Sequence, residues 1–309
     1  MASICRHVEP HRPMANELKN ATHAVQRIMR RQVKNAFEAI QGRAPSDNQI
    51  HGARKDLKKA RAALRLLRVS LGDTVYSRTN AALRDAARPL SVVRDSKVLL
   101  EQLDTLVEHF GARGRALRLE KLRRALRRER TAARRQLRRS SSLEPQVTAL
   151  RGLLVRSTYW RAGAAGWSAV GAGLRRVYGK GRMAMARARA SRSPEDLHEW
   201  RKQVKYLWHQ LQVFEPMRPR VIGRLAQEAH ELASYLGDDH DLAVLRAKVE
   251  QNAAELDRRN LSALIALIDR RRAALEGKAL ALGTRIYREE PRAFAVRFGR
   301  YFRSARGQS

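Results

Sequence analysis

The sequence HGARKDLKKARAALRLL, from His51 to Leu67, returns 147 positions later as HEWRKQVKYLWHQLQVF, from His198 to Phe214. Both stretches begin with the pattern His-x-x-Arg-Lys-x-x-Lys, and apolar residues follow at matching positions. The chain around them is rich in Ala, Leu, Arg, Lys and Glu, which favour helices. We conclude that the chain is a tandem repeat and that each stretch forms a helix.

An apolar stripe follows one face of each predicted helix. In the first copy apolar residues recur every three or four positions, as one helical face requires, at Ile50, Ala53, Leu57, Ala60, Leu64, Leu67 and Leu71. The second copy keeps the stripe at Leu197, Val204, Leu207, Leu211 and Phe214. We expect this face to point into the protein.

A basic stripe lies beside the apolar one, about 100° further round the helix at ~3.6 residues per turn. It comprises His51, Arg54, Lys55, Lys58, Arg61, Arg65 and Arg68 in the first copy, and His198, Arg201, Lys202, Lys205 and His209 in the second. Like charges at this spacing repel, whereas a solvated helix face normally mixes both signs. Because the chain carries the arrangement twice, we interpret the stripes as a surface for an anionic partner. The alternative is a solvated helix face.

The composition agrees with an anionic partner. The 309 residues include 64 Lys and Arg against 30 Asp and Glu, a formal charge of +34, while 43% hydrophobic residues suffice for a core. Self-repulsion destabilises a compact protein of this charge, so binding of a polyanion should stabilise it. The partner classes are polyphosphate, nucleic acid and an anionic membrane surface.

The remaining composition predicts a cytoplasmic protein. Cys5 is the only cysteine, which excludes an intrachain disulfide and fits a reducing compartment. Arg6, His7 and Glu9 stand where a signal peptide needs an apolar core, and no stretch of 18 apolar residues follows. We therefore expect neither export nor a membrane span.

Prolines divide the chain into long helical stretches, and no strand is predicted. We expect one repeat over about 14–140 and a second over about 147–285, with separate helices over 220–236 and 241–256 in the second. A basic segment, 286–309, follows, and its Phe294, Phe298 and Phe302 share one helical face. We expect this face to dock on the bundle, and the alternative is a membrane surface. The segment from Ala162 to Leu174, rich in Gly and Ala, predicts close packing between the repeats.

Two aspartates occupy matching positions near the middle of each repeat. Asp95 follows Arg94, and Asp241 follows His240. A His-Asp pair occurs in metal-dependent phosphohydrolases, but an arginine in the equivalent position cannot bind a metal. We therefore interpret both aspartates as helix N-caps or ion-pair partners. The phosphohydrolase stays an alternative.

With these residues in view, the chain resembles the CHAD family, the conserved histidine α-helical domain, over about residues 14–282. The resemblance rests on the two His-x-x-Arg-Lys-x-x-Lys helices, on Leu-x-x-x-(Arg/His)-Asp-x-x-Val-Leu in each repeat, and on YGKGR from Tyr178 to Arg182. It implies two four-helix bundles related by a pseudo-two-fold axis, with a basic groove between them. It also implies binding of inorganic polyphosphate and association with polyphosphate granules. The Glu-x-Glu-x-Lys motif of the triphosphate-tunnel enzymes fused to some members is absent from the sequence.

These observations together predict an all-α, non-enzymatic polyphosphate-binding protein that needs no cofactor or metal and has no catalytic residues. The expected binding residues are His51, Arg54, Lys55, Lys58 and Arg61 on one wall, His198, Arg201, Lys202 and Lys205 on the other, and Tyr178 and Arg182 as additional hydrogen-bond donors. Lys supplies point charges and Arg a forked donor for phosphate. Other polyanions, namely nucleic acid and nucleotides, are secondary expected partners. The main alternative is a nucleic-acid-binding protein, which would also need aromatic residues for base stacking.

Overall fold

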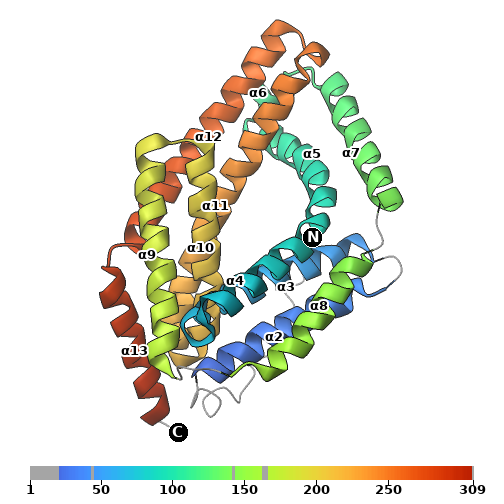
Figure 1. The fold of residues 1–309 in the computed structure, drawn as a ribbon. Helices are drawn as coiled ribbons and strands as arrows, with labels where there is room; N and C mark the ends of the chain where they lie inside the picture. The colour runs from blue at the N-terminus through green and yellow to red at the C-terminus, as the bar shows by residue number, and fades with distance from the viewer. Residues whose placement is uncertain (1–20, 43–44, 141–142, 162–165, 308–309) are drawn as a thin grey trace.

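The computed structural model describes residues 21–42, 45–140, 143–161 and 166–307, with side chains except those of 91–98, 133–140 and 306–307. Within these ranges the chain forms α-helices and short 3-10 turns and contains no strand (Figure 1). The predicted all-α fold is confirmed. Arg94 and Asp95, which the sequence singled out, have side chains outside the described part.

The first half of the chain contains α2 (Ala21–Ile40), α3 (Asp47–Leu66), α4 (Arg68–Ala87), α5 (Val92–His109), the short α6 (Ala112–Arg115) and α7 (Glu120–Ser140). The helix α8 (Glu144–Arg156) connects the halves. The second half contains α9 (Trp167–Ser191), α10 (Pro194–Phe214), α11 (Pro219–Gln251), α12 (Arg258–Ile286) and α13 (Pro291–Gly307).

The two basic helices begin in the same way. The hydroxyl of Ser46 accepts a hydrogen bond from the backbone of Gln49 at 3.3 Å, and the Gln49 side chain accepts one from the Ser46 backbone at 2.8 Å, which makes a capping box. At the equivalent position, the Ser193 hydroxyl caps α10 through the backbone N–H of Asp196 at 3.2 Å. The caps therefore fix the same register for both basic stripes.

The repeats differ where the first contains a proline. Pro89 opens the 3-10 turn Pro89–Ser91 between α4 and α5, because proline lacks the N–H that a continuous helix needs. The equivalent residue, Tyr235, lies inside α11, which continues for 33 residues. The prediction of separate helices over 220–236 and 241–256 was therefore wrong. The intervening residues lack a proline, and both ends of α11 pack against other helices.

The buried apolar residues form two cores. The larger joins α2, α3, α8, α9, α10 and α13 with the adjoining parts of α4, α11 and α12. The smaller lies between α5, α7, the second half of α11 and the first half of α12. Both cores thus take helices from both repeats, and α11 and α12 run through both of them (Figure 1).

Close contact between the repeats depends on a glycine in α9. A Cβ atom on Gly173 would lie 2.6 Å from the Leu66 Cα and 2.7 Å from the Arg65 carbonyl oxygen, both in the backbone of α3. The side chain of any other residue would force the helices apart. Close packing at the Gly- and Ala-rich segment is thus confirmed for its described part. Residues 162–165 lie outside the described residues.

The basic C-terminal segment docks through its aromatic face. Phe294, Phe298 and Phe302 are all buried in the larger core, and the ring of Phe294 stacks on Tyr178 of α9 with centroids 3.9 Å apart. Docking on the bundle is therefore confirmed. Among the described residues, no helix combines the length and apolar character that crossing a membrane requires.

The glycine contact leads to a first prediction. Gly173→Ala should lower the free energy of unfolding by about 1–3 kcal/mol, because the new methyl group meets backbone that has no room to move. Gly277→Ala is the matched control on α12, where a Cβ meets nothing within 4 Å. It should stabilise the protein by about 0.5–1 kcal/mol, since alanine favours helix over glycine. Urea unfolding followed by circular dichroism measures both. A stabilised Gly173→Ala variant would contradict the packing described.

Candidate functional site

A cavity of about 400 Å³ lies between α3, α5, α10 and α11. Its basic lining consists of Arg54, Lys58, Arg61, Arg201, Lys202 and Lys205. The other lining residues are His198, His209, His240, Tyr206, Leu99, Val244 and Asp241. Six Lys and Arg side chains from both repeats thus surround one space, and Asp241 is the acidic residue among the described lining residues.

Neutral groups hold the arginines of α3 in place. Arg54 is 9% exposed, and its Nη1 donates a hydrogen bond to the Leu90 carbonyl oxygen at 2.8 Å. The Nε of Arg61 donates to Asn80 Oδ1 on α4 at 3.2 Å. Such partners orient a guanidinium. The fixed side chains require little further ordering to bind an anion.

The wall formed by α10 repeats this arrangement. Arg201 is equivalent to Arg54, and its guanidinium lies against Gly237, where a Cβ would be 3.4 Å from Nη2. Gly237 is equivalent to Ser91, the neighbour of Leu90, so the two arginines meet the neighbouring segment within one residue of the same point. Lys202 forms an ion pair with Glu199 on its own helix. Lys205 is half-buried and stands at the position equivalent to Lys58.

Two histidines from different helices meet in the cavity. Nδ1 of His198 lies 3.2 Å from Nδ1 of His240, and the ring centroids are 4.3 Å apart. Burial, with Arg201 and Lys202 next in effect, lowers the pKa of His198. Burial, followed by Arg201, lowers the pKa of His240 to about 4. Both imidazoles are therefore neutral at pH 7, and one donates a hydrogen bond to the other.

His209 and Tyr206 complete the wall of α10. His209 is buried and stacks on Trp208 with ring centroids 4.4 Å apart, and burial lowers its pKa to about 4. The guanidinium carbon of Arg65 lies 3.5 Å from the ring centroid of Tyr206, as a cation–π contact. One face of the Tyr206 ring is thus covered by a positive charge.

The structure does not bring every predicted residue to the cavity. His51 and Lys55 are exposed on α3 and lie outside the cavity lining. At 100° per residue, Arg54, Lys58 and Arg61 share one side of the stripe, and His51 and Lys55 lie on its other edge. The capping of α3 also places His51 beyond the first turn, so it does not stand among the free N–H groups of the helix start.

Tyr178 and Arg182, which the sequence also predicts as binding residues, lie outside the cavity lining. Tyr178 is 0% exposed, and its hydroxyl donates to the Ile286 carbonyl oxygen at 2.9 Å and accepts from the Glu289 N–H at 3.2 Å. Arg182 forms an ion pair with Glu290. The YGKGR segment serves packing at these two positions, because its tyrosine fills the contact with α13.

Sequence reasoning missed the meeting of His198 with His240. The only signal was that His240 and Asp241 occupy the matching turn of the second repeat. Asp241 lies in the middle of α11, so its interpretation as a helix N-cap was wrong. Asp239 does not line the cavity, and its carboxylate accepts a hydrogen bond from Arg272 of α12 at 2.9 Å. Burial raises the pKa of Asp239.

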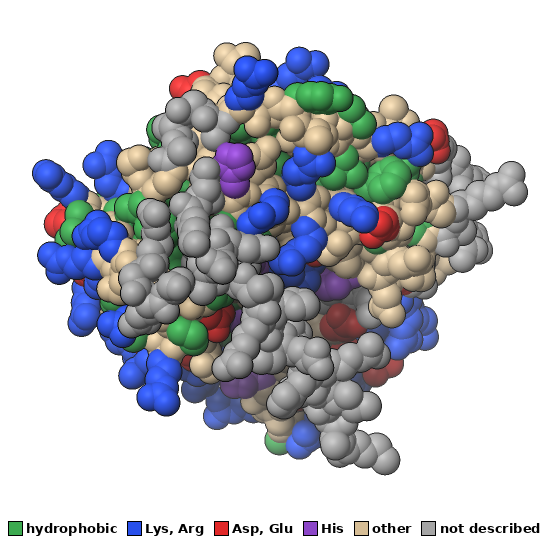
Figure 2. All heavy atoms as spheres, turned by 90° about the horizontal axis from the view of Figure 1, so that it is seen from below, with side chains coloured by type: hydrophobic (Ala, Val, Ile, Leu, Met, Phe, Trp, Pro, Cys, Tyr) green, Lys and Arg blue, Asp and Glu red, His purple; other side chains and the backbone are tan. Residues whose placement is uncertain are grey.

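The described residues contain no cluster of three or more His, Cys, Asp or Glu side chains suited to a metal ion. On the face shown in Figure 2, Lys and Arg side chains are spread widely and acidic ones are few. The site is thus a basic cavity within a basic surface, and its specific features are the braced arginines and the histidine pair.

The chain was also compared with known proteins. No curated protein matches it. The family model described as CHAD domain matches residues 23–250, which extend from α2 almost to the end of α11 and include every residue of the cavity lining. The chain therefore belongs to the CHAD domain family.

Proposed function

We propose that this protein binds inorganic polyphosphate in the cavity between α3 and α10 and does not turn it over. The observation that carries the proposal is the convergence of six Lys and Arg side chains from two repeats on one space of about 400 Å³. A linear polyanion with a charge on every unit matches such a space. Family membership supports this ligand, since CHAD domains in general are linked to polyphosphate.

The chemistry of the wall suits phosphoryl oxygens. Arg54 and Arg61 present forked donors whose orientation is set by Leu90 and Asn80. Lys58 and Lys205 supply point charges from α3 and α10. Partial burial reduces competition from water, so each charge-assisted contact contributes more than it would on an open surface.

The aromatic residues favour polyphosphate over single-stranded nucleic acid. Base stacking needs an open ring face. Arg65 covers a face of Tyr206, and Trp208 is half-buried between His209 and His230, with centroids 4.4 and 4.1 Å from its own. A phosphate chain without bases makes no use of stacking.

We propose binding without turnover because metal-assisted phosphoryl transfer uses clustered carboxylates, and Asp241 stands alone among the described lining residues. Association with polyphosphate granules follows from the same affinity. Bound polyphosphate would neutralise part of the protein's formal charge of +34 and would stabilise the folded state.

One prediction tests the site against a diffuse positive field. Lys58→Ala with Lys205→Ala should weaken polyphosphate binding by at least about a hundredfold, because charge-assisted contacts contribute about 1.5–3 kcal/mol each. The control is Lys121→Ala with Arg124→Ala, two exposed positions on α7. Solvated charges contribute below about 1 kcal/mol, so the control should change affinity little.

Isothermal titration calorimetry at one salt concentration measures both pairs, with single-stranded DNA and heparin as competing ligands. Equal losses for the two pairs would show that net charge alone binds the ligand. Tighter binding of single-stranded DNA than of polyphosphate would favour the nucleic-acid function. Shortening of the chains after incubation with Mg²⁺ or Mn²⁺ would overturn binding without turnover.

A second prediction concerns pH. The lowered pKa values of His198, His209 and His240 mean that the free protein holds these rings neutral, and a bound polyanion favours their protonated forms. Polyphosphate binding should therefore take up protons and tighten as pH falls from 8 to 5. Titrations in buffers of different ionisation enthalpy measure the uptake, and His198→Gln with His240→Gln should reduce it. Affinity that is independent of pH would contradict the assignment.

In the unliganded protein, the same three histidines should lower the free energy of unfolding as the pH falls. Because their folded pKa values lie below the ordinary 6.5, the unfolded chain binds more protons at low pH. The free energy of unfolding should fall as pH drops from about 6.5 towards 4, and saturating polyphosphate should reverse part of this loss. Thermal unfolding across this range, with and without ligand, measures both effects.

A further inference from the structure

A second basic hollow lies outside the cavity, where the junction of α3 and α4 meets α9. Its volume is about 510 Å³, and its charged lining consists of Arg68, Asp73, Arg175 and Arg176. Gly72 opens the wall, because its φ of 75° and ψ of 161° interrupt the helical path of α4. None of these residues contributes to the cavity described above.

The glycine contact of α9 brings this hollow against the basic stripe of α3. Gly173 touches the backbone of Leu66 and Arg65, and Arg176 and Lys180 follow it at three and seven positions, on the same face of α9. The close approach of the helices therefore places the two cations of α9 beside the last residues of the α3 stripe. In the sequence, Arg176 and Lys180 lie more than 100 positions after Arg65 and Arg68.

The electrostatics confirm that the four cations are neighbours. Burial lowers the pKa of Lys180, and Arg176, Arg65 and Arg68 lower it further, while Glu199 opposes them. Among the described residues no acidic side chain forms an ion pair with Arg175, Arg176 or Lys180. Arg68 is paired with Asp73 at 2.6 Å, and Asp73 is the carboxylate of this hollow.

The hollow and the cavity are connected through Arg65. The guanidinium of Arg65 stacks on Tyr206, which lines the cavity, and its Nη1 donates to the Arg61 carbonyl oxygen at 2.9 Å. Arg54, Lys58, Arg61 and Arg65 follow one side of α3 over about 16 Å, at 1.5 Å per residue. A row of cations thus leads out of the cavity and continues into the group formed by Arg68, Arg176 and Lys180.

We propose that Arg65, Arg68, Arg176 and Lys180 form a second anion subsite, which binds phosphoryl groups of a polyphosphate chain that already occupies the cavity. This inference rests on the proposed function. The subsite gives the protein a preference for long chains, because a short chain fills the cavity and leaves the second group of cations without contact. Each additional charge-assisted contact slows dissociation of a long chain.

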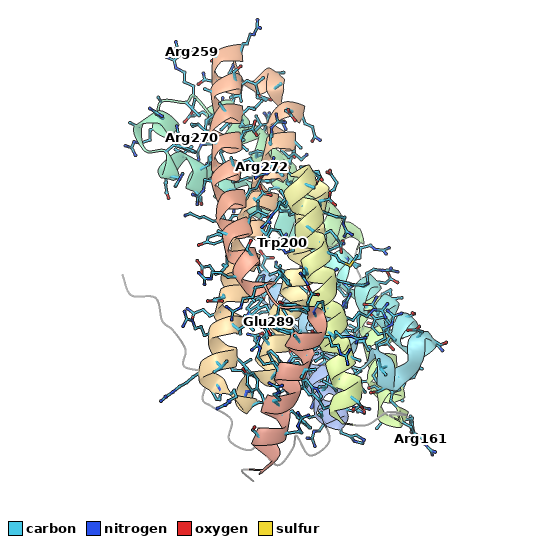
Figure 3. All side chains as sticks on the ribbon, turned by 90° about the vertical axis from the view of Figure 1, so that its left-hand side faces the viewer. Arg161, Trp200, Arg259, Arg270, Arg272 and Glu289 are labelled. Atoms are coloured by element: carbon cyan, nitrogen blue, oxygen red, sulfur yellow. The ribbon has the colours of Figure 1, made fainter. Side chains whose placement is uncertain are left out.

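Titrations with tripolyphosphate and with long-chain polyphosphate at one salt concentration test the subsite. Arg176→Ala with Lys180→Ala should weaken long-chain binding by about tenfold and leave tripolyphosphate binding within about twofold. Arg259→Ala with Arg270→Ala is the matched control, since both side chains are exposed and project from α12, as Figure 3 shows. The control should change neither affinity by more than about twofold.

The outcomes separate the subsite from the proposed function. Wild-type protein that binds neither ligand overturns both. If the wild-type protein binds both ligands and the Arg176/Lys180 variant binds long-chain polyphosphate as tightly as the wild type or the control variant, the subsite alone is overturned. The subsite is also overturned if the Arg176/Lys180 variant loses as much affinity for tripolyphosphate as it loses for long-chain polyphosphate. Melting temperatures of the variants verify that each one folds.

Removal of a negative charge from the hollow gives a second test of the subsite. Asp73→Asn removes the carboxylate that pairs with Arg68 and should strengthen long-chain binding by about threefold, while tripolyphosphate binding stays unchanged. The control is Asp269→Asn, which removes another exposed carboxylate that pairs with an arginine, Arg246. An equal gain in both variants would show that only net charge changed, and the subsite would be overturned.

Discussion

The packing of α3 against α10 fixes the position of the cations in the cavity. These helices carry the equivalent basic stripes, and their apolar stripes meet in the larger core. A buried hydrogen bond from Gln210 Nε2 to the Ala62 carbonyl oxygen, 3.0 Å long, joins them at the centre. Gln210 is 0% exposed, so the bond sets the register between the helices as well as satisfying two buried polar groups. One interface therefore decides how far apart the two walls lie.

That arrangement brings like charges together, which opposes folding. The protein tolerates it because the burial of Leu57, Leu64, Leu207 and Leu211 between the helices is favourable, at about 25 cal/mol per Å² of apolar surface. In the folded protein these like charges remain close together, and their combined positive potential attracts anions. An anion in the cavity removes repulsion as well as adding contacts, so stability and affinity depend on the same charges.

The arginines near the cavity and those elsewhere have different kinds of partner. Arg54, Arg61 and Arg65 contact a carbonyl, an amide and an aromatic ring, respectively. Away from the cavity, Arg272 pairs with Asp239 and Arg297 with Glu289. Carboxylate partners stabilise a buried arginine by compensating its charge, whereas the carbonyl, amide and ring contacts orient the guanidinium.

The sequence by itself determined the helical fold, the repeat and the identity of most cavity cations. The periodicity of the apolar residues follows directly from helix geometry. The same geometry places Arg54, Lys58 and Arg61 on one basic stripe and Arg201, Lys202 and Lys205 on the equivalent stripe of the second repeat. The tertiary structure alone decided which side of each stripe faces the cavity, because this depends on the rotation of α3 against its neighbours. It therefore excluded His51 and Lys55, buried Tyr178 and brought His240 to His198. These outcomes depend on contacts between residues far apart in the chain, and spacing along a single helix carries no information about them.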